Sequence, residues 1–174
     1  MLVLIRGAGD LASGAALRLH RANFLVVMTD LPQPTAIRRT VCFSQAIRFG
    51  KTTVEDAVGV CCKTAREVKA ALSVGEIPVL PDETASCRTW LHPEVLVDGI
   101  LAKRNLGTKI TDAPLVIALG PGFCAGRDCH AVIETMRGHT LGRVIRSGPA
   151  LPNTNIPGLI GGFAGERVLR APDD

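Results

Sequence analysis

The first 30 residues alternate between apolar runs and a helical pattern. Residues 2–5 (LVLI) and 24–28 (FLVVM) are short uninterrupted apolar runs, which are typical of strands buried on both faces. Between them, Leu11, Ala15 and Leu19 recur at the spacing of one helix face. This order predicts a strand, a helix and a parallel second strand, the opening unit of a Rossmann-like fold.

A glycine turn joins the first predicted strand to the helix. Gly7 allows a tight turn, and Gly9 has no side chain to keep an anionic group from the backbone N–H groups at the helix start. Ala12 takes the third position of the fingerprint, and Asp30 ends the second strand, where an acid can bond a ribose hydroxyl. The pattern predicts a nucleotide-like ligand, and the alternative is that the glycines serve packing alone. Asp10 suits the helix dipole but would repel a pyrophosphate that faced it directly.

The rest of the chain continues the alternation of strands and helices. Thr64 and Glu67 have the spacing of a capping box and predict a helix to about Leu72. Short helices are predicted at 41–47 and 84–91, strands at 53–62, 77–80, 95–98, 115–119 and 166–170, and a hairpin from 130–135 and 141–145. We therefore expect one Rossmann-like α/β domain over residues 1–174, with a mostly parallel sheet, flanking helices and a C-terminal hairpin at the sheet edge.

Basic side chains follow the strand predicted at 95–98, and a second glycine turn follows the strand predicted at 115–119. Because parallel strands end at one edge of a sheet, we expect these segments to face the same crevice as the first turn. Lys and Arg side chains there can hold a phosphate, and the arginines after the second strand can reach over the first turn or form a solvated face. The predicted cofactor-binding residues are Gly7, Gly9, Asp10, Asp30, Arg38, Arg39, Lys103, Arg104, Asn105, Gly120, Gly122 and Phe123.

Composition narrows the classes of partner. The net charge is +4, but there is no Tyr and only one Trp, so the sequence does not favour the basic and aromatic surface of a nucleic-acid-binding protein. A small anionic cofactor explains the positive charge better. No apolar run reaches the length of a membrane span, and the first strand begins too early for a signal peptide, so we expect a cytoplasmic protein. Its six cysteines are then expected to be reduced thiols, and their spacing matches no common zinc site.

Catalytic chemistry is weakly indicated. Glu134 with His130 or His139 could form an acid–base pair, but no nucleophile or metal pattern accompanies them. Whether the protein is an enzyme is left open.

Taken together, the motifs resemble the YqeB-type accessory proteins of selenium-dependent molybdenum hydroxylases, which are distant relatives of the xanthine dehydrogenase accessory factors. The resemblance spans nearly the whole chain. It rests on residues 5–12 (IRGAGDLA), 32–39 (PQPTAIRR), 100–107 (ILAKRNLG), 119–123 (LGPGF), 130–135 (HAVIET) and 142–145 (GRVI).

The resemblance implies a role in maturation. The protein would bind the molybdenum pterin cofactor, or help to install its terminal sulfur or selenium ligand, before the cofactor enters a hydroxylase apoenzyme. Longer family members are expected to continue into a β-rich domain that this chain lacks. No catalytic residue is carried over, although Cys124 could accept sulfur or selenium if Lys103 or Arg104 stabilised its thiolate.

Two other functions use the same residues. One is an NAD(P)-dependent oxidoreductase, because NAD and a pterin dinucleotide both carry a pyrophosphate and a ribose. The other is a protein-interaction module without a ligand, in which the glycines are purely structural. The edge hairpin could also pair across the axis of a homo-oligomer.

Overall fold

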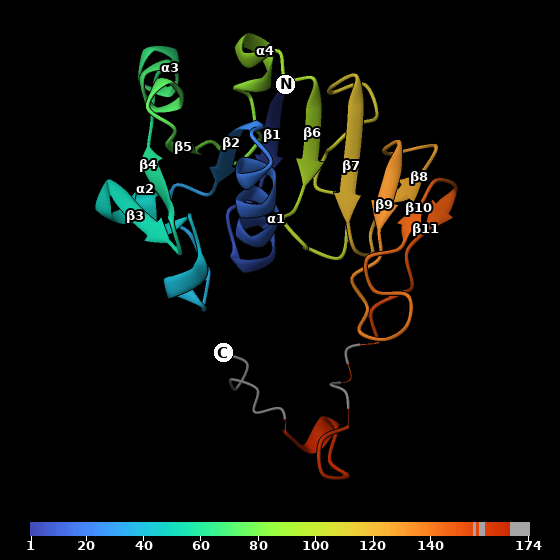
Figure 1. The fold of residues 1–174 in the computed structure, drawn as a ribbon. Helices are drawn as coiled ribbons and strands as arrows, with labels where there is room; N and C mark the ends of the chain where they lie inside the picture. The colour runs from blue at the N-terminus through green and yellow to red at the C-terminus, as the bar shows by residue number, and fades with distance from the viewer. Residues whose placement is uncertain (155, 157–158, 168–174) are drawn as a thin grey trace.

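The computed structural model describes residues 1–154, 156 and 159–167, and these form a nine-stranded sheet between helices (Figure 1). The strand order is β10-β9-β7-β6-β1-β2-β5-β4-β3. Its strands are β1 (Leu2–Arg6), β2 (Leu25–Asp30), β3 (Lys51–Val54), β4 (Ala57–Cys61), β5 (Ile77–Pro81), β6 (Val95–Asp98), β7 (Leu115–Leu119), β9 (Ala131–Ile133) and β10 (Val144–Ile145). A separate antiparallel pair joins β8 (Cys124–Ala125) to β11 (Gly148–Pro149).

The sheet is parallel from β4 to β9, and only the edge strands β3 and β10 pair antiparallel with their neighbours. Within it, the run β5-β2-β1-β6-β7-β9 reproduces the 3-2-1-4-5-6 order of a doubly wound sheet. After β1, the chain builds β2, the outer β3–β4 hairpin and β5 on one side of β1, and then crosses to build β6 on the other side. The switch point therefore lies between β1 and β6, where such sheets bind ligands.

Helices cover both faces of the sheet. On one face, α1 (Asp10–Arg21) and α2 (Gln45–Phe49) pack Ala16, Leu17 and Ala46 against apolar residues of the central strands. On the other face, α3 (Ala65–Ser73) and α4 (Arg88–Leu91) cover a second core, in which Val68 is buried and against which Leu91 packs. Short 3-10 helices lie at η1 (Arg39–Val41) and η2 (Gly165–Arg167).

The predicted fold class is confirmed. The parallel strands, the capping box at Thr64 and the antiparallel β9–β10 pair at the sheet edge all agree with the sequence pattern. The single strand predicted at 53–62 is wrong, because the chain turns back at Glu55, which has φ 54°. The region contains the end of β3, this turn and β4, and the two strands form an antiparallel hairpin. Of the strand predicted at 166–170, the first two residues belong to η2 and the remainder lies outside the described residues. No helix in the described part of the chain is long and apolar enough to cross a membrane.

Candidate functional site

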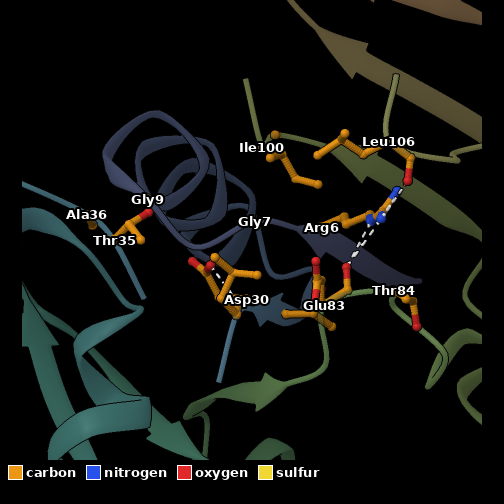
Figure 2. A pocket seen from close by; sticks show the side chains of 13 residues that line it. Arg6, Gly7, Gly9, Asp30, Thr35, Ala36, Glu83, Thr84, Ile100 and Leu106 are labelled. Carbon is orange, nitrogen blue, oxygen red and sulfur yellow. Dashed lines mark hydrogen bonds between the residues drawn. The ribbon is translucent and has the colours of Figure 1, made fainter. Parts of the chain in front are cut away.

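A cavity of about 520 Å³ opens at the carboxyl ends of the central strands, beside the switch point. In Figure 2 it lies between Thr35 and Ala36 on one side and Arg6 and Leu106 on the other, with Asp30 and Glu83 below. Its wall comes from the ends of β1, β2, β5 and β6 and the loops that follow them. The lining residues are Arg6, Gly7, Gly9, Thr29, Asp30, Leu31, Thr35, Ala36, Glu83, Thr84, Gly99, Ile100 and Leu106.

The first glycine turn forms one wall of this cavity. Gly7 has φ +99°, and a Cβ atom there would lie 3.0 Å from the carbonyl oxygen of Gly99, so the backbone conformation and the close approach of two loops both require glycine. Gly9 differs, because it has an ordinary φ of −69° as the N-cap of α1 and a Cβ atom there would meet no atom within 4 Å. The fold itself therefore does not require glycine at position 9.

Asp30 lines the cavity at the end of β2. Its carboxylate accepts hydrogen bonds from the backbone N–H of Ala8 at 2.9 Å and of Leu31 at 2.7 Å. Burial raises the pKa of Asp30, and these two hydrogen bonds act in the opposite direction. Because a carboxylate offers about four lone-pair sites, it retains acceptor capacity for the hydroxyl groups of a sugar.

Asp10 lies outside the cavity lining and is neutralised by one of the predicted arginines. Its carboxylate oxygen is 2.8 Å from a guanidinium nitrogen of Arg38. This ion pair offsets the negative charge that would repel a phosphate at the helix start. The side chain of Arg39 is exposed where η1 begins.

Hydrogen bonds at Ala8 also fix the first glycine turn in place. The hydroxyl of Ser13 donates to the carbonyl oxygen of Ala8 at 3.2 Å and accepts from the N–H of Phe43 at 2.9 Å. The N–H of Ser44 donates to the same Ala8 carbonyl at 3.0 Å. The turn is therefore fixed by α1 and by the segment before α2.

Arg6 is a site residue that the sequence analysis did not identify. Only 6% of its surface is exposed, and its guanidinium donates to the carbonyl oxygens of Glu83 and Leu106 and to the hydroxyl of Thr108. Asp98 lies 3.7 Å from the guanidinium and accepts a 2.6 Å hydrogen bond from Thr108. This network ties the loops after β5 and β6 to the end of β1 and so holds two walls of the cavity. A signal existed in the sequence, because Arg6 and Asp98 are each the charged residue that ends an apolar strand.

The second glycine turn packs against another part of the chain. A Cβ atom at Gly122 would lie 2.5 Å from the backbone nitrogen of Arg104 and 2.6 Å from the carbonyl carbon of Lys103. A Cβ atom at Gly120 would lie 2.6 Å from the hydroxyl of Thr135, and the side chain of Phe123 is buried.

Asn105 stabilises the loop between β6 and β7. Its side chain bonds the backbone of Gly107 and Thr108. The lining of the 520 Å³ cavity contains none of Lys103, Arg104, Asn105, Gly120, Gly122 and Phe123, although Ile100 and Leu106 of the same loop belong to it.

The candidates for catalysis serve the local structure. The buried carboxylate of Glu134 accepts from the N–H groups of Met136 and Leu151, both at 2.8 Å, and these bonds contribute to lowering its pKa against the opposing effect of burial. His130 accepts a hydrogen bond through Nδ1 from the N–H of Val116. Cys124 is half-buried on β8, and all six cysteines carry free thiols. His130, Glu134 and Cys124 do not line the cavity.

Fold and site together define a class of protein. The chain is a Rossmann-type α/β domain with a cavity at the topological switch point, bounded by a glycine turn at a helix start and by an acid at the end of the second strand.

Comparison with curated proteins adds one relative. The chain is 53% identical over 171 residues, or 98% of its length, to an Escherichia coli K12 protein described as "Uncharacterized protein YqeB". The matched region is 32% of that protein, so the chain spans about a third of its relative's length. No protein-family model and no solved structure matches the chain.

Proposed function

We propose that this chain binds the phosphate-bearing molybdenum pterin cofactor as part of an accessory protein in the maturation of a selenium-dependent molybdenum hydroxylase. The observation that carries the proposal is the cavity at the switch point, in which Gly9 presents open backbone at a helix start and Asp30 retains acceptor capacity. The resemblance of the sequence to the YqeB-type accessory proteins supplies the choice of cofactor.

The residues that line the cavity fit the parts of a nucleotide-bearing ligand. The helix start at Gly9 suits a phosphate, because backbone N–H groups and the helix dipole both favour an anion. Asp30 suits the hydroxyl groups of a ribose. Leu31, Ile100 and Leu106 supply the apolar surface that a flat heterocycle needs. In this assignment the chain holds the cofactor for transfer to the hydroxylase apoenzyme, before or during the insertion of sulfur or selenium.

An NAD(P)-dependent oxidoreductase is the second candidate, because the Gly7–Gly9 turn and Asp30 suit NAD equally well. Hydride transfer also needs an acid or base at the substrate, and the candidates Glu134 and His130 do not line the cavity. We therefore place cofactor binding for maturation first. The third candidate, a protein-interaction module, would not require open backbone at Gly9.

The test is to identify what the protein carries. The chain would be produced anaerobically together with a molybdenum hydroxylase system, purified, and denatured, and the released small molecule would be identified by mass spectrometry. We expect a molybdenum pterin or its oxidised derivative. A nicotinamide dinucleotide would instead establish the oxidoreductase, and an empty protein would favour the interaction module.

A further inference from the structure

The doubly wound sheet has two halves that meet at the switch point, but the cavity belongs mainly to the first. Its lining comes from the ends of β1 and β2 and from the loops that follow β1, β2, β5 and β6. Among the described residues, none of β7, of β9 or of the turn after β7 lines the cavity. In a sheet of this order a dinucleotide lies across both halves, with one nucleotide unit on each. The cavity therefore lacks the second of the two positions that a dinucleotide uses.

The loop after β6 occupies the second half. A Cβ atom at Gly122, in the turn after β7, would lie 2.5 Å from the backbone nitrogen of Arg104 and 2.6 Å from the carbonyl carbon of Lys103. A Cβ atom at Gly120 would lie 3.1 Å from a methyl group of Leu101. The glycine turn that would receive the second nucleotide is therefore already in contact with the protein itself.

Hydrogen bonds hold the loop after β6 in place. The side chain of Asn105 donates to the carbonyl oxygen of Thr108 at 2.8 Å and accepts from two backbone N–H groups. Arg6 donates to the carbonyl oxygen of Leu106 at 2.9 Å, and these two residues mark one end of the cavity in Figure 2. The hydroxyl of Thr108 donates to the buried carboxylate of Asp98 at 2.6 Å. The loop is therefore an integral part of the fold, and displacing it would break this network.

Two residues of the same loop have an uncommon backbone conformation. Leu101 and Lys103 both have φ +61°, in the left-handed region that residues other than glycine rarely adopt. Such conformations cost free energy and persist only where the surrounding contacts impose them. Both residues lie where the loop meets Gly120 and Gly122, so the contacts with the second glycine turn define the position of the loop.

We propose that the cavity is a site for a single nucleotide unit, and that any group joined to its terminal phosphate lies outside the second half of the sheet. The inference rests on the proposed function and defines its ligand class. With the phosphate at Gly9 and the ribose at Asp30, one nucleotide unit occupies the cavity. The other end of a dinucleotide then extends into solvent, where a second protein can reach it.

This arrangement bears on the two cofactor-binding candidates. It suits a chain that holds a cofactor for transfer to another protein, because the end of the ligand outside the cavity stays accessible. It does not suit hydride transfer, which requires the nicotinamide to be held beside a bound substrate.

Isothermal titration calorimetry with matched ligands tests the limit to one nucleotide. ADP, CDP and GDP identify the base that the wild-type protein binds most tightly. The comparison ligand is the symmetrical dinucleotide of the same base, in which two nucleosides share one pyrophosphate. We expect it to bind no more than about fivefold more tightly than the diphosphate, because its second nucleoside buries little surface. A larger gain in affinity would overturn the inference.

Hydrogen–deuterium exchange locates the second nucleoside. With saturating dinucleotide, residues 119–123 should exchange as they do with saturating diphosphate, and residues 101–108 should exchange no faster. Added protection at 119–123 or faster exchange at 101–108 would mean that the second nucleoside displaces the loop. Either result would overturn the inference.

Gly9→Val is the matched variant, because its side chain should obstruct the phosphate of both ligands. The affinities for the diphosphate and the dinucleotide should fall by the same factor. A dinucleotide that keeps its affinity while the diphosphate loses it would be held through the second half of the sheet, which contradicts the inference.

The diphosphates separate this inference from the proposed function. If they bind and the dinucleotide binds much more tightly still, the limit to one nucleotide fails while the proposed phosphate and sugar sites stand. If none of the three diphosphates binds, the proposed cofactor site fails and the limit to one nucleotide fails with it.

Discussion

The turn after β1 and the turn after β7 both place two glycines around a single residue at the end of an apolar strand, but their surroundings differ. Gly9 borders a cavity and has open space where a side chain would be. Gly122 has φ +108° and lies against the backbone of Lys103 and Arg104. The same glycine spacing therefore serves packing in one turn and leaves backbone accessible in the other, and only the neighbouring atoms distinguish the two.

The largest expected effect comes from the buried Arg6 network, which ties the loops after β5 and β6 to the end of β1. Arg6→Met leaves the Asp98 carboxylate buried without its cation, so the free energy of unfolding should fall by about 3–5 kcal/mol in urea denaturation. The double variant Arg6→Met/Asp98→Leu removes both charges and should recover much of the loss. A double variant as unstable as the single one would contradict the role given to this ion pair.

Gly122→Ala tests the packed turn. The new Cβ atom would meet the Arg104 backbone in a left-handed conformation, so we expect a loss of about 2–4 kcal/mol from strain and overpacking. Gly126→Ala is a useful comparison, because Gly126 also has a positive φ of +88° but a Cβ atom there meets nothing within 4 Å. If the two variants lose equal stability, backbone conformation alone explains the effect and the close packing against Arg104 does not.

Asp30→Asn should act on stability and binding with opposite dependence on pH. Because burial raises the pKa of Asp30, the folded protein binds a proton at this carboxyl more tightly than the unfolded chain does. Protonation therefore stabilises the fold at acid pH, and this contribution is lost as pH rises through the raised pKa. The Asn variant loses one of the two side-chain oxygens that accept from backbone N–H groups, at a cost of about 1–2 kcal/mol, and this penalty should be largest in acid and shrink towards neutral pH.

Nucleotide binding supplies the other half of this prediction. The ionised carboxylate is the better acceptor for ribose hydroxyls, so wild-type affinity for ADP should rise as pH increases through that pKa. The Asn variant should bind about tenfold more weakly at neutral pH and show a flatter profile. Parallel pH profiles measured by calorimetry would exclude Asp30 from the sugar site.

Gly9→Val should have the smallest effect on stability, below about 1 kcal/mol, because the site has room and an ordinary φ. Its side chain should nevertheless keep a phosphate from the helix start and weaken ADP binding about 100-fold, the equivalent of one strong hydrogen bond to a charged group. Gly14→Ala, in the same helix, is the control and should leave binding unchanged. Wild-type-like ADP affinity in Gly9→Val would mean that no phosphate lies at this turn.

Much of the fold could be predicted from local patterns. The uninterrupted apolar runs identified the parallel strands, and the capping box located the start of α3, because these signals depend on neighbouring residues. The first turn and Asp30 were also predicted as a unit, since one βαβ segment contains both. Gly7, Gly9 and Asp30 line the cavity, whereas Ala8 bonds Asp30 through its N–H and Asp10 lies outside the lining.

Contacts that depend on how distant segments of the chain pair could not be predicted. Arg6 and Asp98 are far apart in the chain, and only the pairing of β1 with β6 brings them together. The second turn was expected to face the crevice, but the connection from β6 to β7 is an irregular loop whose backbone lies against Gly122. Whether that connection forms a helix or a loop depends on tertiary packing, which the local sequence does not determine.

The most direct test of the central claim is the cofactor content of wild type and Gly9→Val after anaerobic production beside a molybdenum hydroxylase system. Released pterin and phosphate would be quantified per mole of folded protein. We predict a near-stoichiometric molybdenum pterin in wild type and a folded but empty Gly9→Val variant. Equal cofactor content in the two proteins, or none in wild type, would contradict the cavity at the switch point as the cofactor site.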